Sequence, residues 1–305
     1  MSIDYVKVLN SLSYDYTVIG RSEVSAAQFK EKTDVDPFCG GIERFLKLKP
    51  DLPDAAIVSV GVEQLAPVAK TLIHYGVKRI LLEKPGGISS IELSDLFEAA
   101  ISHEAEVYIA YNRRHYASVR AVRRFIEEDG GVSSFNFEIT EWSHIIQGHN
   151  KDALTMHSWF LGNTSHVIDT AFFMCGEPET ISSYCSGGLS WHPASSNYAG
   201  AGVSKTGALF AYHGNWQAPG RWSIEVLTKK RKYIFRPMEK LHVQELGSVA
   251  IQPLDVEEAN LDFDFKPGLH RQVRCFIEGD VQDFCTLEHQ IELVRIYERM
   301  AGYCK

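Results

Sequence analysis

A lysine that directly follows an apolar run in the first third of the chain is the first candidate for chemistry. Residues 79–82 read Arg-Ile-Leu-Leu, and Glu83, Lys84 and Pro85 follow at once. A short run that is apolar on both faces is typical of a central strand in a parallel sheet covered by helices. Because ligands of such sheets bind beyond the carboxyl ends of the strands, we expect Lys84 to face a functional cleft. The alternative is an ordinary surface lysine at a strand end.

The pattern around Lys84 alternates strands and helices. Ser89 and Glu92 have capping-box spacing for a helix that ends near residue 102. Gly76 supplies a stop for a helix that begins near Leu65. The expected strands are residues 16–19, 55–60, 79–82 and 107–111, and the other expected helices are residues 3–12, a polar segment that ends near 32, and 41–48. This order predicts a parallel sheet with right-handed crossovers.

The order of the expected helices and strands changes after residue 115. A long helix is expected over about 116–128, and strand-like runs follow at 135–140, 223–227 and 232–235. Residues 247–268 are acidic and punctuated by proline, and the last helices are expected at about 267–278 and 287–302. Strands that are grouped together with few helices between them indicate a mainly antiparallel sheet, so this half is predicted to be α+β.

The first half, with Glu83-Lys84-Pro85 at one strand end and residues 111–114 closing the next strand, resembles the Gfo/Idh/MocA family of NAD(P)-dependent oxidoreductases. A second family signature, a histidine with an aspartate three residues later, matches His166 and Asp169. The resemblance covers most of the chain. It implies a Rossmann-like dinucleotide-binding domain, here residues 1–115 with the first βα element incomplete. It also implies a C-terminal α+β domain for substrate binding and oligomerisation, residues 116–305, with an open antiparallel sheet whose outer face commonly makes homo-oligomer contacts.

The residue types fit hydride-transfer chemistry. A hydride that moves to or from a carbonyl carbon must be matched by a proton at the oxygen, and a histidine can deliver or accept that proton. A lysine ammonium can stabilise developing alkoxide charge. We therefore expect His166 to be the acid/base and Lys84 its electrostatic partner. The alternative for His166 is a core histidine that bonds a backbone carbonyl.

Two departures from the family pattern stand out. Gly162 occupies the position where the family often has an aspartate, four residues before the histidine, and its neighbour Asn163 can orient a substrate but cannot act as a base. The chain also has no G-x-G-x-x-G turn, and Ser2-Ile3 resemble the residues that come after such a turn. Either the true start lies upstream of Met1 or the protein has lost many of the contacts that bind the dinucleotide. The strands beside a missing central strand should then be partly exposed.

The second strand suggests which dinucleotide would bind. Its end, Gly20-Arg21-Ser22, carries an arginine, which suits a ribose 2′-phosphate and favours NADP over NAD. The alternative is an ordinary turn arginine, and NAD remains possible. The resemblance adds further expected cofactor residues, which are Ser59, Val60, Gly61, Glu83, Lys84, Pro85 and Arg113.

The substrate side is rich in aromatic and hydrogen-bonding residues. Such a mixture suits a polyhydroxylated ring whose faces are stacked and whose hydroxyls are bonded. The substrate expected from this mixture and from the resemblance is a sugar, a sugar nucleotide or a cyclic polyol. The histidines do not have the spacing of a helical metal site, so no metal is expected. The expected substrate-binding residues are Tyr111, Arg114, Trp159, Asn163 and Asp169.

Composition excludes several classes of function. The 305 residues carry a net charge of −8 and a pI near 5.8, which argues against nucleic-acid or anionic-membrane partners. No apolar run reaches the roughly 20 residues of a membrane span, and the N-terminus lacks an export signal, so a cytoplasmic location is expected. Reduced thiols are expected because the six cysteines are scattered singly, at 39, 175, 185, 275, 285 and 304.

These observations predict a two-domain oxidoreductase that transfers a hydride between a nicotinamide and a sugar-like substrate. The alternative is a non-catalytic family member, a binding or scaffold protein that has lost its dinucleotide site. The absent glycine turn favours the alternative, and the retained Lys84 and His166 oppose it.

Overall fold

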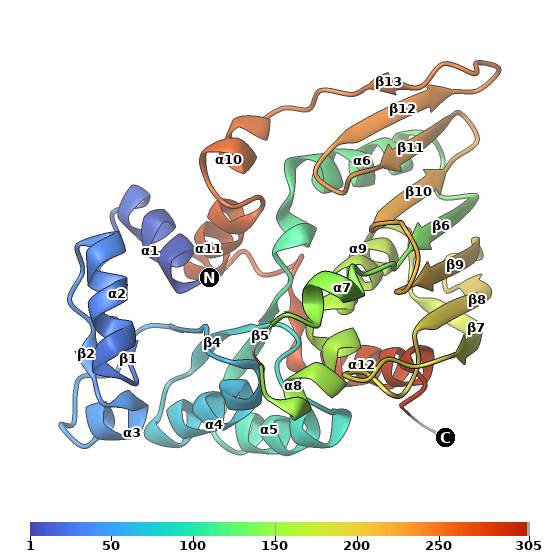
Figure 1. Cartoon of the computed structure of the whole chain (residues 1–305). Coiled ribbons are helices and arrows are strands. Elements are labelled where there is room, and N and C mark those ends of the chain that lie inside the picture. The colour runs from blue at the N-terminus through green and yellow to red at the C-terminus, as the bar shows by residue number, and fades with distance from the viewer. Residues whose placement is uncertain (150, 304–305) are drawn as a thin grey trace. The chain divides into compact units, whose positions relative to one another are not determined.

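The chain divides into two units, each built around its own sheet (Figure 1). A computed structural model describes residues 1–149 and 151–303. Met1–Asn112 and Leu261–Ile291 form the first unit, and Arg113–Asn260 with the segment from Glu292 onward form the second. The sequence pattern placed everything after residue 115 in a second domain, whereas Leu261–Ile291 return to the first unit. Sequence periodicity does not reveal such a return, because it reports which face of a helix is apolar and not its partner.

The larger sheet of the first unit has four strands. Strands β3 (Ala56–Val58), β4 (Arg79–Glu83) and β5 (Glu106–Ala110) are parallel, and β14 (Cys285–Thr286) adds to β5 in the antiparallel sense. Ile80, Leu81 and Leu82 of β4 are completely buried, as the two-sided apolar run predicted. The crossovers run through α4 (Leu65–Tyr75) and α5 (Ser90–Ser102).

The ends of these two crossover helices follow the predicted signals. Gly76 closes α4 with a φ of +115°, a left-handed conformation that favours glycine. The side chain of Ser89 caps α5 by accepting a hydrogen bond from the Glu92 amide at 3.3 Å. The carboxylate of Glu92 accepts from the Ile88 amide at 2.7 Å. These contacts fix the helix that begins shortly after Lys84.

A second, two-stranded sheet stands apart from the larger one. Strands β1 (Ile19–Gly20) and β2 (Phe38–Cys39) pair in parallel. They are connected by α2 (Glu23–Thr33), and α1 (Ser2–Ser11) and α3 (Gly41–Leu46) flank them in sequence. Among the described residues, β1 pairs only with β2, and β3 pairs only with β4. Ala56 and Ile57 of β3 are consequently only partly buried, which is the exposure expected where a central strand is lacking.

The returning segment completes the core of the first unit. Helix α11 (Leu269–Glu278) buries Leu269, Val273 and Phe276 against a cluster that includes Tyr5 of α1 and Tyr108 of β5. The rings of Tyr108 and Phe276 lie 6.2 Å apart in an edge-to-face arrangement. This helix therefore covers one face of β4 and β5 and packs against α1.

The second unit is organised by an eight-stranded sheet. Its order is β13-β12-β11-β10-β6-β9-β8-β7, and every neighbouring pair is antiparallel except β6 and β9. The strands are β6 (Ser134–Glu138), β7 (Pro178–Ser186), β8 (Asn197–Ser204), β9 (Leu209–Asn215), β10 (Ser223–Leu227), β11 (Arg231–Phe235), β12 (Leu241–Glu245) and β13 (Gln252–Pro253). Strands β6, β10 and β11 fall where the sequence predicted strands, and β7, β8 and β9 were not predicted.

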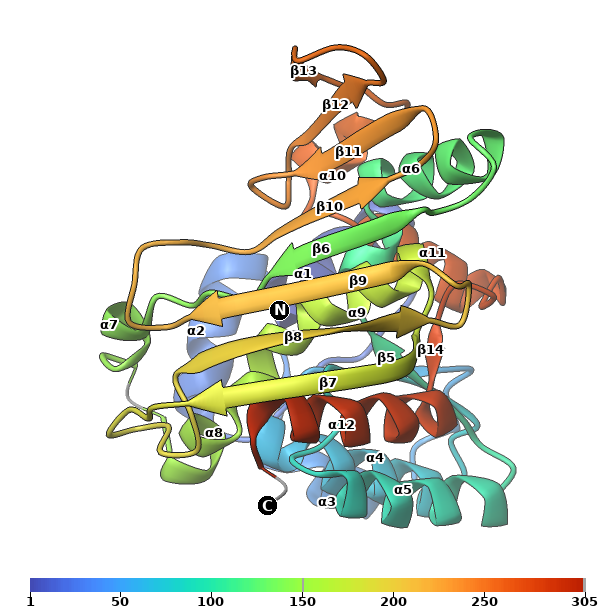
Figure 2. The same cartoon turned by 90° about the vertical axis from the view of Figure 1, so that its right-hand side faces the viewer.

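One face of this sheet packs on helices and the other is open, as Figure 2 shows. Phe172 of α9 (Ser165–Cys175) makes edge contacts with the rings of Phe135, Phe137 and Phe210 on the covered face. The remaining helices are α6 (Ala117–Glu128), α7 (Ser143–Ile146), α8 (Ala153–His157), α10 (Ala259–Asp264) and α12 (Leu287–Ala301). The open face consists of alternating exposed residues, which matches the period of two of an antiparallel sheet.

Candidate functional site

Lys84 follows the carboxyl end of β4, the place at which ligands of parallel sheets bind. The chain turns immediately after it, and the Gly86 amide donates to the Glu83 carbonyl at 3.0 Å. Gly86 has a φ of +89°, and a Cβ at this position would lie 2.9 Å from Ile109 Cδ1. The turn is therefore packed against the core, which fixes the backbone that carries the partly exposed Lys84.

The glutamate before Lys84 points into the protein. Glu83 is buried, and its Oε1 accepts a hydrogen bond from the Tyr5 hydroxyl at 2.7 Å. Burial raises the pKa of Glu83, and this effect is opposed by the Lys84 charge and by the Tyr5 hydrogen bond. Glu83 was predicted to bind cofactor, which stays a prediction, and in the structure its side chain bonds α1 to the strand that carries Lys84.

A buried glutamine ties the Lys84 turn to the end of the next strand. Gln290 Nε2 donates to the Pro85 carbonyl at 2.9 Å and to the Tyr111 hydroxyl at 3.0 Å. Tyr111, a predicted substrate-binding residue, is only 1% exposed. Its hydroxyl thus serves to join β5 and the Lys84 turn inside the first unit. Gln290 carried no signal in the sequence, because its role depends on the return of the C-terminal segment.

Five of the predicted cofactor residues lie at the carboxyl ends of β1 and β3. Arg21 and Ser22 follow β1 and are exposed, and the Ser22 hydroxyl accepts from the Ser25 amide at 3.2 Å to cap α2. Ser59, Val60 and Gly61 follow β3, and Val60 is 45% exposed. The described residues contain no G-x-G-x-x-G turn at these strand ends.

His166 lies in the first turn of α9, directly after an irregular segment of helix. Phe160–Thr164 form a π-helical turn, a feature that is common at functional sites. His166 is 9% exposed, and the centre of its ring lies 6.3 Å from that of Trp222. The helix therefore presents His166 beside a large aromatic side chain from the loop before β10.

The predicted substrate residues Arg114 and Asp169 bind each other. Arg114 Nε and Nη2 donate to Asp169 Oδ2 and Oδ1 at 2.9 and 2.5 Å, and both side chains are buried. The Arg114 guanidinium also lies over the Phe173 ring at 4.7 Å. This two-pronged pair joins the segment after β5 to the helix of His166, which makes it a support for that histidine.

A carboxylate that sequence reasoning missed lies next to the π-helical turn. Glu141 Oε1 accepts from Asn163 Nδ2 at 2.9 Å and from Thr164 Oγ1 at 2.8 Å. Its Oε2 accepts from Arg221 Nη1 at 3.2 Å. Burial raises the pKa of Glu141, and these three partners oppose the rise. The signal that could have found it is its place just beyond the β6 strand.

The arginine that binds Glu141 stacks between two tryptophan rings. The Arg221 guanidinium lies 5.0 Å from the Trp142 ring and 4.5 Å from the Trp222 ring. Arg113, predicted to bind cofactor, belongs to the second unit, where its guanidinium lies 5.0 Å from the same Trp222 ring. Trp159, whose predicted role in substrate binding stays a prediction, packs edge-to-face with Trp191 at 6.1 Å between ring centres.

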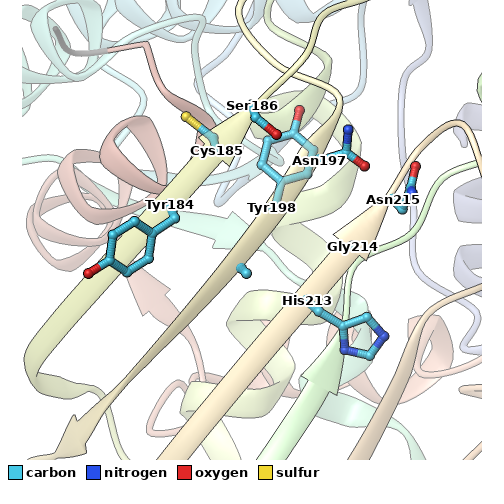
Figure 3. Close-up of a pocket in the computed structure, with 9 residues that line it drawn as sticks. Tyr184, Cys185, Ser186, Asn197, Tyr198, His213, Gly214 and Asn215 are labelled. Atoms are coloured by element: carbon cyan, nitrogen blue, oxygen red, sulfur yellow. The ribbon is translucent and has the colours of Figure 1, made fainter.

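Four other features of the described residues bear on the location of a site: possible metal ligands, membrane-spanning helices, cysteines and surface hollows. No three His, Cys, Asp or Glu side chains in 1–149 and 151–303 are grouped so as to hold a metal. No helix in the same residues is both long and apolar enough to cross a membrane. The five described cysteines are free thiols, and Cys304 lies outside the described residues. A hollow of about 330 Å³ opens at one end of β7, β8 and β9, and its lining, shown in Figure 3, contains none of the predicted site residues.

Comparison with known proteins identifies the fold. No protein-family sequence model matches the chain, and no curated protein matches it by sequence. Among solved structures, UDP-N-acetylglucosamine 3-dehydrogenase from Acidithiobacillus ferrooxidans is 12% identical with a TM-score of 0.73, over 98% of this chain and 93% of that one. An inositol dehydrogenase homologue from Azotobacter vinelandii, complexed with NAD⁺, is 14% identical with a TM-score of 0.77, over 98% and 90%.

A third solved structure gives the same result. An oxidoreductase from Agrobacterium radiobacter, in complex with NAD⁺, L-tartaric acid and magnesium, is 10% identical with a TM-score of 0.77, over 99% of this chain and 93% of that one. The two-domain fold predicted from the Gfo/Idh/MocA resemblance is therefore confirmed. The parallel sheet of the first unit and the mainly antiparallel sheet of the second were both predicted correctly.

Proposed function

We propose that this protein is an oxidoreductase that transfers a hydride between a nicotinamide and a sugar, a sugar nucleotide or a cyclic polyol. The observation that carries the proposal is the fold, which is shared over nearly the whole chain with dehydrogenases, together with Lys84 at the carboxyl end of a central parallel strand. The first unit would hold the dinucleotide and the second would hold the substrate.

The chain's own residues divide the chemistry between them. His166 would deliver or accept the proton at the substrate oxygen, and Lys84 would stabilise the negative charge that develops there. The buried Arg114–Asp169 pair would keep the His166 helix in register, and Tyr5 and Gln290 would hold the backbone on either side of Lys84. None of these supports is exposed to compete for substrate.

The dinucleotide, when bound, supplies or accepts the hydride. Arg21 and Ser22 would contact its ribose, with Arg21 favouring a 2′-phosphate and hence NADP. NAD is the cofactor named for the two solved relatives from Azotobacter and Agrobacterium.

The second unit suits a polyhydroxylated substrate. Because Asn163 Nδ2 is committed to Glu141, its Oδ1 is oriented to accept a hydrogen bond from a hydroxyl. Trp142 is 48% exposed, which makes its indole available to stack on a sugar ring. The relative from Acidithiobacillus acts, by its name, on a sugar nucleotide.

The formation of reduced nicotinamide tests this function. The full chain would be incubated with NAD⁺ or NADP⁺ and a panel of sugars, cyclic polyols and UDP-sugars. With any substrate found, Lys84→Met and His166→Ala are each expected to lower kcat by about a hundredfold or more. Lys78→Met, which removes an exposed lysine just before the amino end of the same strand, is the matched control. Turnover at the wild-type rate in either test variant would refute the assigned roles.

We also propose that the open sheet face forms a homo-oligomer contact in a cytoplasmic protein. The outward rows of β7, β8 and β9 carry no charge over much of their length, and Tyr184 and Leu209 are 72% and 63% exposed. These rows include Thr180, Ser182, Tyr184, Ala199, Ala201, Val203, Leu209 and Ala211. Light scattering should show an assembly that Ala201→Asp dissociates, and an unchanged mass in that variant would contradict the contact.

A further inference from the structure

Two buried donors near His166 have no acceptor among the described residues. They are Arg113 Nε and Trp222 Nε1. Trp222 is only 4% exposed, so water does not readily replace the missing bond. A buried donor without an acceptor is unfavourable, and such groups in native proteins call for an explanation. The two side chains are in contact, because the Arg113 guanidinium lies 5.0 Å from the Trp222 ring.

The same indole carries a second arginine. The Arg221 guanidinium lies 4.5 Å from the Trp222 ring and 5.0 Å from the Trp142 ring. Stacking on aromatic rings holds a guanidinium flat and leaves the N–H groups at its edge able to donate. The Arg221 side chain is 43% exposed, so it is accessible to a ligand.

The carboxylates near Arg113 and Arg221 accept hydrogen bonds from only some of the N–H groups of these arginines. Glu141 is the carboxylate nearest to Arg221 and contacts its Nη1 alone, at 3.2 Å. Glu239 is 3.9 Å from Arg113 Nη2, beyond hydrogen-bond distance, and is half exposed. Arg114 is committed to Asp169 and adds no available charge. The cluster of Arg113, Arg221 and Trp222 thus has more donors than its protein partners use.

We propose that this cluster binds an anionic oxygen group, a carboxylate or a phosphate, on the substrate that His166 acts upon. Planar arginines match such groups in geometry as well as charge, and the Trp222 indole would donate a third hydrogen bond. The identification of the rest of the ligand as a sugar rests on the proposed function. If the cluster binds such a group, the expected substrate is an acidic or phosphorylated sugar or polyol rather than any sugar or polyol.

Three ligands that share one ring test the inference. The full chain, without dinucleotide, would be titrated by calorimetry with D-glucuronate, D-glucose 6-phosphate and D-glucose. At least one of the two anions is expected to bind about tenfold or more tightly than glucose, and added salt is expected to weaken the binding. The anion that binds better distinguishes a carboxylate from a phosphate as the natural group.

Variants locate the effect. Arg113→Gln and Arg221→Gln are each expected to weaken anion binding by about tenfold. Arg124→Gln is the matched control, because the Arg124 guanidinium lies over the Phe125 ring at 5.4 Å but belongs to the exposed side of α6. If Arg113→Gln fails to fold, the partly exposed Arg221→Gln still carries the test.

Three results would overturn the inference: no binding of either anion, glucose binding as tightly as the anions, or variants that bind the anions like the wild type. Each is separate from a failure of the proposed function, because no dinucleotide takes part. A chain that oxidised only neutral polyols would keep the function and lose the anion site. A chain that bound the anions but no nicotinamide would keep the site and lose the function.

Discussion

The sheets of the two units differ in continuity. The second unit has eight consecutive hydrogen-bonded strands, of which the longest has nine residues. The first unit has a four-stranded sheet and a separate pair, β1 and β2, of two residues each. Four of the candidate substrate residues, Arg114, Trp159, Asn163 and Asp169, lie in the unit that holds this sheet, whereas the candidate ribose contacts Arg21 and Ser22 follow the first strand of the separate pair. The difference indicates that β1 and β2 open locally more readily than the strands of the second unit.

The largest effect is expected at the buried Arg114–Asp169 ion pair of the second unit. Asp169→Asn leaves the buried Arg114 charge without its counter-ion, and breaking such a pair costs about 3–5 kcal/mol. Urea unfolding would measure the loss. The double variant Arg114→Met with Asp169→Leu should recover much of it, because no buried charge is then left alone. A loss below about 1 kcal/mol in Asp169→Asn would show that the pair is not a support of the His166 helix.

Hydrogen exchange would measure the difference between the sheets directly. Amides of β1 and β2 are expected to exchange at least roughly a hundredfold faster than those of β8 and β9, because local opening of the short pair exposes few apolar contacts. Equal protection in the two regions would contradict the view that β1 and β2 are the weaker scaffold. Addition of a dinucleotide that binds should slow exchange at β1 and β2 selectively.

Two glycines with the same backbone conformation separate packing from strain. Gly86 and Gly130 have φ values of +89° and +88°. A Cβ at Gly86 would lie 2.9 and 3.0 Å from Ile109 and Leu93, whereas one at Gly130 would meet nothing within 4 Å. Gly86→Ala should therefore cost roughly 1–3 kcal/mol more than Gly130→Ala in urea unfolding. Equal costs would mean that the Lys84 turn is looser than its contacts indicate.

The smallest effect concerns pH. Because burial raises the pKa of Glu83, the folded chain holds that proton more tightly than the unfolded chain. Its contribution to stability is thus fully present below the ordinary carboxyl pKa of about 4.3 and is lost as pH rises towards the folded-state pKa. Glu83→Gln keeps an acceptor for Tyr5 and should flatten this fall, as measured by unfolding at several pH values. Exposed Glu98→Gln is the control, and a parallel pH profile in Glu83→Gln would contradict the assignment.

Sequence reasoning recovered those elements whose signals are local. The two-sided apolar run of β4, the Ser89 cap and the Gly76 stop each depend on neighbouring residues, and all three were predicted correctly. Strands β7, β8 and β9 were missed because β7 and β8 are rich in serine, glycine and alanine, so the alternation that marks a strand is weak, and because β9 places the apolar Leu209 and Ala211 on its outward face. The strand predicted at 16–19 shares only Ile19 with β1, because only Ile19 and Gly20 pair with β2.

The candidate site could be predicted only in part, because sequence signals are local and many contacts of the site are not. Lys84 and His166 stand in sequence motifs, but the residues that hold them act across long separations. Gln290 reaches Pro85 across 205 positions, and Arg221 reaches Glu141 across 80. No periodicity carries such information. The assignments of Glu83 and Tyr111 as ligand contacts stay predictions, and the structure gives both side chains internal partners.

A thermal-shift titration with NADPH and NADH tests the central proposal most directly. Ligand at a hundredfold excess over its Kd stabilises the folded chain by about 2.7 kcal/mol, which should raise the Tm by roughly 2 °C or more. A shift with NADPH that Arg21→Ala abolishes, and that the control Arg124→Ala retains, is the predicted result. A flat response to both nucleotides at millimolar concentration would contradict hydride transfer by this chain and favour a non-catalytic binding protein.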